Sequence, residues 1–163
     1  GVFSLIIGFI LVIIFMFIKY RIFGLVSNIS LIANLFMMIG ILTILEATLT
    51  LPGIAGIILT VGMAVDSNVL IYERIKEELK TEKSIIHAFD TGYNKAKITV
   101  IDANVTTLIA AIILFIFGSG PVKGFAVTLG IGITTTLFSA YFIARHLTSV
   151  IILNDKNKKY FKL

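Results

Sequence analysis

Residues 53–72 have the sequence GIAGIILTVGMAVDSNVLIY, in which Asp66 is the only charged side chain. With a rise of about 1.5 Å per residue, a helix over this range crosses the ~30 Å hydrocarbon core of a bilayer. A carboxylate near the bilayer centre costs about 2.5–3.5 kcal/mol, so it persists only where it faces protein or a wet cavity. This stretch therefore predicts a transmembrane helix with a functional acid inside it.

Four further ranges are apolar and long enough to span a bilayer, namely 1–18, 25–45, 98–117 and 125–144. The 163-residue chain is 58% hydrophobic and only 14% charged, with a mean hydropathy of +1.04, whereas soluble domains are about a quarter charged. The sequence predicts an all-α polytopic membrane bundle of five transmembrane helices, with residues 1–163 as a single domain. Cysteine is absent, so neither a disulfide nor a thiolate metal site is expected.

The basic residues fall almost entirely on one side of this predicted bundle. All but one of the 14 lysines and arginines share that side, and Lys123 alone lies on the other. Because cytoplasmic segments collect Lys and Arg, residues 19–21, 73–97 and 146–163 are predicted to face the cytoplasm, which makes the C-terminus cytoplasmic. Topology accounts for the net charge of +5, so no nucleic-acid partner is expected.

The polar range 73–97 separates the third and fourth predicted spans. Its apolar side chains recur at helical spacing: Ile75, Leu79, Ile85, Ile86, Phe89 and Tyr93. This spacing predicts one or two short amphipathic helices, with Ser84 as the N-cap and Gly92 as the C-cap of the second. A helix that lies on the cytoplasmic membrane face is favoured over a docking surface for a partner.

Polar side chains within the third and fourth spans are the candidate functional residues. Asn68 and Asn104 can join helices through hydrogen bonds of about 0.6 kcal/mol each, so a structural role is favoured for them. An acid differs, because protonation converts an acceptor-only anion into a neutral donor. We therefore assign a proton relay to Asp66 and Asp102, although a structural role is an equal alternative for Asp102. The residues expected to support the relay are Ser67, Asn68, Asn104, Thr106 and Thr107.

The third and fourth spans are predicted to be antiparallel, which fixes the depth of these side chains. Asp66 and Asn104 fall about 5 Å to the cytoplasmic side of the midplane, and Asn68 and Asp102 about 8 Å. Residues two apart on a helix point about 200° from each other, so all four side chains cannot converge. Glycine, alanine and threonine around Asp66 predict a tight bundle. We expect Asp66 to face its interior, with its nearest polar side chain from Asp102, Asn104, Thr106 or Thr107.

Two classes of function fit such an acid. One is a proton-coupled transporter or translocation motor, since a charge that crosses about 100 mV releases about 2.3 kcal/mol. The other is an intramembrane aspartyl protease, in which Asp66 and Asp102 would share a proton. That protease type carries glycine-x-glycine before one acid, whereas Ala64 and Val65 precede Asp66. We therefore expect no enzyme activity and no metal or other cofactor, with protons as the coupling ion.

Two long stretches resemble a known family. TLPGIAGIILTVGMAVDSNVLIYERIKEEL at 50–79 is similar to the signature of SecD, the membrane subunit of the SecDF complex of bacterial protein export. DANVTTLIAAIILFIFGSGPVKGFAVTLGIGI at 102–133 resembles the next block of that family, and Arg145 closes the last helix as it does there. By this resemblance Asp66 matches the family aspartate implicated in the proton path. Ser67 departs from the alanine that is usual at its position.

The resemblance implies half of a resistance-nodulation-division type transporter, which uses the proton motive force to promote protein translocation across the bacterial cytoplasmic (inner) membrane. The implied partners are a SecF-like subunit, the Sec translocon channel, exported preproteins and membrane lipid. The chain begins at Gly1 without an initiator methionine or a signal peptide, so we interpret it as a fragment. A first helix and a large external domain are expected before Gly1. A proton-coupled exporter of small amphiphiles or lipids is the alternative.

Overall fold

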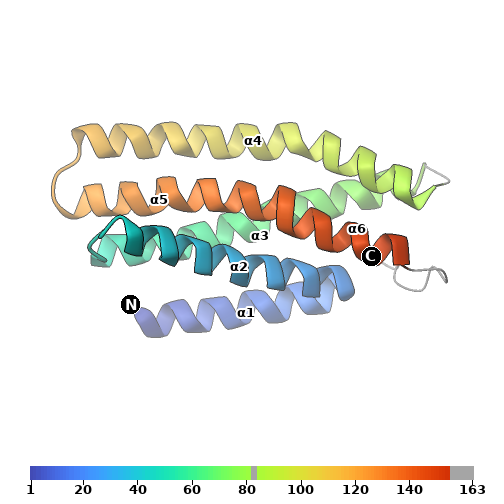
Figure 1. Ribbon diagram of the computed structural model, residues 1–163, viewed down its shortest axis with the longest axis horizontal. Helices are drawn as coiled ribbons and strands as arrows, with labels where there is room; N and C mark the ends of the chain where they lie inside the picture. Colours follow the sequence, from blue (N-terminus) through green and yellow to red (C-terminus); the bar gives the residue numbers. More distant parts are fainter. Residues whose placement is uncertain (82–83, 155–163) are drawn as a thin grey trace.

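The computed structural model describes residues 1–81 and 84–154, which form helices joined by short turns (Figure 1). Helix α1 spans Val2–Tyr20, α2 spans Ile22–Ile44, α3 spans Leu51–Leu79 and α4 spans Ile85–Phe117. The last part is one continuous rod of α5 (Pro121–Phe138), the π-helical segment η1 (Ser139–Ala144) and α6 (Arg145–Asn154). Five helical segments of the described part are long and apolar enough to cross a membrane. The predicted all-α bundle of five spans is confirmed.

The five spans lie side by side along the long dimension of the molecule (Figure 1). Helices α1, α2, α5 and α4 follow one another across the view, and α3 lies behind α5. Helix α3 packs mainly against α5 and α4, and it also touches α2 and α1. The helix that carries Asp66 is therefore the central one. The end of the bundle that holds the α1–α2 turn, the α3–α4 turn and α6 is called the basic end below.

Close packing between α3 and α5 depends on small side chains. A Cβ atom added at Gly132 would lie 2.3 Å from the Oγ1 atom of Thr60 and 2.9 Å from its Cβ. Thr60 is buried, and its hydroxyl donates to the Gly56 carbonyl at 2.8 Å, so it presents no free polar group to α5. Small residues let helix backbones approach closely in membranes, where no hydrophobic force drives them together. The tight bundle predicted from these residues is confirmed.

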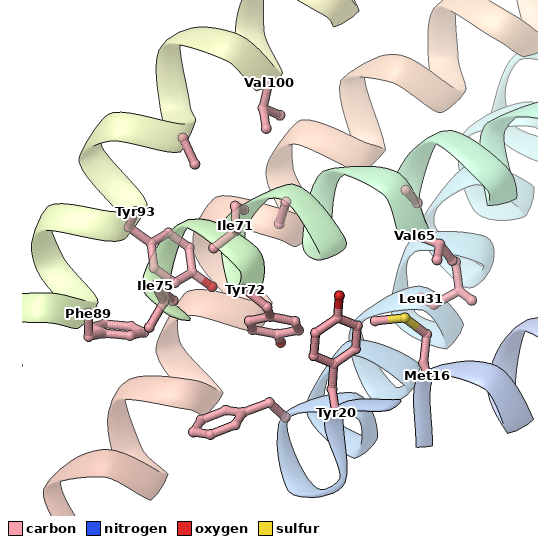
Figure 2. Packing of buried hydrophobic residues seen from close by; sticks show 14 of the residues in the cluster. Met16, Tyr20, Leu31, Val65, Ile71, Tyr72, Ile75, Phe89, Tyr93 and Val100 are labelled. Carbon is pink, nitrogen blue, oxygen red and sulfur yellow. The ribbon is translucent and has the colours of Figure 1, made fainter. Parts of the chain in front are cut away.

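Buried aromatic rings lock three helices together near the basic end (Figure 2). Tyr20 of α1 and Tyr72 of α3 have ring centroids 5.4 Å apart, and Phe89 and Tyr93 of α4 lie 4.8 Å apart. All three tyrosines are almost fully buried. Tilted aromatic pairs add about 0.5–1.5 kcal/mol beyond their burial. This cluster holds α1 and α4 against α3 just beyond the predicted span of α3.

The range 73–97 is helical as predicted, but it does not form separate helices on the membrane surface. Helix α3 continues to Leu79 and α4 begins at Ile85, so the two spans extend past the apolar zone as a helical hairpin. Ser84 is the N-cap of α4, as predicted, and its side chain accepts a hydrogen bond from the His87 amide. The predicted C-cap at Gly92 is wrong. Gly92 lies within α4. A glycine is needed there because a Cβ atom would lie 2.6 Å from the Ile75 side chain of α3.

Candidate proton-relay site

Asp66 lies on the outer side of α3, away from the helices that pack against it. Its side chain is exposed, and so are Gly62 one turn before it and Leu70 one turn after it. A Cβ added at Gly62 would meet no atom within 4 Å. In the described part of the chain, Asp66 has no hydrogen bond or ion pair. These three residues mark an open stripe along the central helix, called the open face below.

The expectation that Asp66 faces the shared interior is therefore wrong. The interior position belongs to Asn68, which is 3% exposed, and on α4 to Asn104, which is also 3% exposed. The reason is helical periodicity, because side chains two residues apart point to nearly opposite sides. The four polar residues divide as that periodicity requires, with both amides inside and both acids outside. The helix that buries Asn68 must expose Asp66.

Asp102 of α4 lies on the same side of the molecule as Asp66. Leu70 of α3 and Thr99 of α4 line one pocket, so these two residues face each other across the open side of the α3–α4 pair. Asp66 lies one turn from Leu70, and Asp102 lies nearly one turn from Thr99, in the same direction along the bundle. Asp102 is exposed as well. Both predicted relay acids are thus exposed, Asp66 on the open face and Asp102 on the neighbouring helix α4.

The pocket itself opens below the two acids, at the basic end. Its volume is about 360 Å³, and its lining residues are Leu70, Glu73, Arg74, Glu77, Lys95, Ala96 and Thr99. Glu78 stands behind it, buried, and accepts a 2.7 Å hydrogen bond from Lys95 and lies 3.5 Å from an Arg74 nitrogen. This buried carboxylate joins α3 to α4. A polar space with room for several water molecules therefore begins one helical turn from Asp66, at Leu70.

Sequence reasoning missed this pocket. The signal was present in the charged residues at 73–78, where Arg74 precedes Glu77 and Glu78 by three and four residues. They were interpreted as the polar side of a separate surface helix. Because α3 continues straight through them, they instead extend the stripe that carries Asp66.

The supporting residues of the prediction divide between the interior and the open face. Ser67 is buried and donates to the Met63 carbonyl at 2.9 Å, so its hydroxyl is satisfied within α3. Thr106 is exposed and donates to the Asp102 carbonyl at 2.9 Å. Thr107 is half-buried and donates to the Ala103 carbonyl at 3.1 Å. Each of these hydroxyl protons is held by the helix backbone, and none is donated to Asp66.

The buried amides are satisfied only in part. Asn104 donates its amide proton to the Val100 carbonyl at 2.7 Å, while its Oδ1 atom and that of Asn68 lack a donor in the described residues. Acceptors without donors inside a membrane protein are costly, about 1–3 kcal/mol each.

A second charged cluster joins α1 to α3 at the basic end, beyond the predicted span 53–72. The Tyr20 hydroxyl donates to the Oε1 atom of Glu73 at 2.7 Å. This Glu73 oxygen also lies 3.4 Å from the Lys76 nitrogen and 3.9 Å from the Lys19 nitrogen. The Tyr20 hydrogen bond, helped by both lysines, lowers the pKa of the Glu73 carboxyl below its usual value. Glu73 thus stays ionised where it lines the pocket.

In residues 1–81 and 84–154, no group of three His, Cys, Asp or Glu side chains is placed to hold a metal ion.

A comparison with family models matches residues 1–154 to the description "Protein export membrane protein SecD/SecF, C-terminal". The chain belongs to this SecD/SecF family. The match covers every described helix, including the open face and both acids. The family resemblance of the two quoted stretches is confirmed.

Individual members of the SecD/SecF family are similar in sequence to nearly the whole of this chain. The chain is 49% identical over 158 residues to the "Protein translocase subunit SecD" of Magnetococcus marinus, and 55% identical over 153 residues to that of Rickettsia prowazekii. These alignments cover 97% and 94% of this chain. The chain spans about 30% of the length of either relative.

A solved structure of the SecD/SecF family has the same fold. The crystal structure of SecDF, a translocon-associated membrane protein from Thermus thermophilus, superposes with a TM-score of 0.89 at 42% identity. The superposition covers 93% of this chain and 21% of the SecDF chain. A second SecDF structure, in a super-membrane-facing form, gives a TM-score of 0.90 at 41% identity. The helix arrangement described above is therefore that of the SecDF membrane region.

Proposed function

We propose that this chain is the transmembrane part of a protein-export subunit that uses the proton motive force to promote protein translocation across the bacterial cytoplasmic membrane. The observation that carries the proposal is Asp66, a carboxylate in the middle of an apolar helix, exposed on the open face. The names of the relatives, translocase subunits, support protein as the cargo rather than small amphiphiles or lipids. The proposal places the protein in the inner membrane with α6 ending in the cytoplasm, in accord with the bias of basic residues.

An exposed carboxylate within a span cannot remain against lipid, where it would cost about 2.5–3.5 kcal/mol or more. The open face must therefore be covered by protein or water. We infer that a SecF-like subunit covers it, because Gly62, which is exposed and has no side chain, allows a neighbouring helix to approach Asp66 closely. The Sec translocon channel and exported preproteins are the further partners that this function requires.

The chemistry proposed for the site is reversible protonation. Asp66 takes up and releases a proton between the outer side and the polar pocket, and Asp102 is the second carrier on the neighbouring helix α4. A charged Asp66 prefers water or a cationic partner, and a neutral one tolerates a dry helix contact, so each transfer changes how the partner packs. Protons are the only coupling species in this proposal, with no cofactor and no bond-breaking reaction.

The test uses the full-length protein assembled with its SecF-like subunit in membrane vesicles. We expect Asp66→Asn to abolish translocation driven by the proton gradient while assembly stays intact, because the amide keeps the shape but cannot titrate. Glu46→Gln is the matched control, since Glu46 is an exposed carboxylate in the α2–α3 turn. Its translocation should equal that of the unchanged protein. Normal proton-driven translocation by Asp66→Asn would refute the proton-carrier role.

A further inference from the structure

A second pocket lies on another side of the basic end, apart from the open face. Its volume is about 280 Å³, and it is formed where α4 meets η1 and α6. Its lining residues are Phe89, Asp90, Tyr141, Phe142, Arg145, His146 and Ser149. Arg145 directly follows the predicted span 125–144, so the pocket stands at the level of the lipid headgroups.

Arg145 is held in this pocket, but not all of its N–H donors have an acceptor there. Its guanidinium carbon lies 5.5 Å from the centre of the Tyr93 ring, and one of its nitrogens lies 3.4 Å from an Asp90 oxygen. That distance is long for a charge-assisted hydrogen bond, which is normally about 2.7–2.9 Å. A guanidinium has five N–H donors, and its side chain is 40% exposed here. Donors therefore remain for an anion that reaches the pocket.

Other groups around the pocket suit an anionic amphiphile. The exposed rings of Phe138 and Phe142 stack with centroids 4.9 Å apart, on the membrane side of Arg145. The order from the membrane outward is thus the apolar aromatic pair, then Arg145, then the Ser149 hydroxyl. A phospholipid has the same order, with acyl chains followed by a phosphate.

We propose that this pocket binds the phosphate headgroup of an anionic phospholipid, with Arg145 as its main ligand and the Phe138–Phe142 pair against its acyl chain. Asp90, which pairs with Arg145, would compete with the phosphate for the guanidinium. The site is independent of proton transfer, since neither Asp66 nor the polar pocket contributes to it. It would anchor the α4–α6 junction to the charged membrane surface.

Native mass spectrometry of the full-length protein in detergent measures this directly. The probes are dioleoyl phosphatidylglycerol and dioleoyl phosphatidylcholine, whose acyl chains are identical. We expect phosphatidylglycerol to bind more tightly, and Arg145→Gln to weaken it about tenfold, because a charge-assisted hydrogen bond is lost. The effect on phosphatidylcholine should be smaller, because its choline cation offsets the phosphate charge. The matched control is Lys80→Gln, which removes the same charge from the exposed α3–α4 turn. An equal effect from Lys80→Gln would reduce the preference to general surface charge and overturn the site.

Asp90→Asn keeps the proposal testable if Arg145→Gln fails to fold. The site predicts several-fold tighter phosphatidylglycerol binding, because Arg145 is released and a repelling charge is removed. A purely structural Arg145–Asp90 ion pair predicts unchanged or weaker binding, and that result would refute the site. Inorganic phosphate separates the two sources of the ligand. Displacement of phosphatidylglycerol by inorganic phosphate at equal concentration would mean a soluble-anion site and would overturn the lipid assignment.

Discussion

Asp66 and Asn68 lie two residues apart on α3 and point to opposite sides of it. Asn68 is 3% exposed in the interior of the bundle, and Asp66 is exposed on the open face. The helix therefore separates an amide that serves packing from an acid that is available to a partner. In the proposed proton-carrier role, Asp66 would change its protonation without disturbing the contacts that hold α3, α4 and α5 together.

The first prediction concerns this division. Asn68→Asp should destabilise the protein by about 2–3 kcal/mol, because a carboxylate would replace an amide in a closed interior that offers its Oδ1 atom no donor. Asp66→Asn should leave stability unchanged to within about 0.5 kcal/mol. Thermal unfolding of both variants in detergent is the measurement. Equal destabilisation by the two substitutions would mean that the sides of α3 are not distinct.

The second prediction concerns the α3–α5 contact. Gly132→Val should destabilise the bundle by about 1–3 kcal/mol or more, because its Cβ would overlap the Thr60 side chain. Adding Thr60→Ala should restore part of the loss, since it removes two of the three atoms involved. Gly40→Ala is the control, because its Cβ would meet no atom within 4 Å. If the double variant is no more stable than Gly132→Val alone, the two residues are not in contact.

The third prediction concerns the hairpin beyond the membrane. Glu78→Gln should cost about 1–3 kcal/mol, because the buried carboxylate accepts from Lys95 and neighbours Arg74. Glu77→Gln should cost less than about 1 kcal/mol, since the Glu77 side chain is 61% exposed and its pair with Arg74 is screened by solvent. Chemical denaturation of both variants compares them. A larger loss for Glu77→Gln would contradict the central role of Glu78.

The fourth prediction concerns orientation. Single cysteines at Lys80 and Ser119 should react with an impermeant thiol reagent from opposite sides of the membrane, Ser119 in intact cells and Lys80 only after the cells are opened. The reason is that α4 separates them and spans the bilayer. Labelling of Lys80 but not Ser119 in intact cells would reverse the assignment of the basic end to the cytoplasm, and labelling of both would contradict the predicted topology.

The sequence by itself determined the five spans and the antiparallel order of α3 and α4, and it singled out Asp66 and Asp102 as candidates. These follow from local properties, namely the length of apolar runs, the cap at Ser84 and the cost of a charge in hydrocarbon. The division of the polar residues also follows from the 3.6-residue period. The period states that Asp66 and Asn68 point apart, but it does not state which of them points inward.

Only the tertiary structure decided that choice, because it depends on which side of α3 receives α4 and α5. The contact of Gly132 with Thr60 and the seat of Ile75 against Gly92 fix the rotation of α3, and with it the exposure of Asp66. The contact of Ile75 with Gly92 also holds α3 and α4 together beyond the apolar zone as one hairpin. Sequence reasoning predicted separate surface helices there. Periodicity is a property of one helix, whereas the side that is buried is a property of the pair.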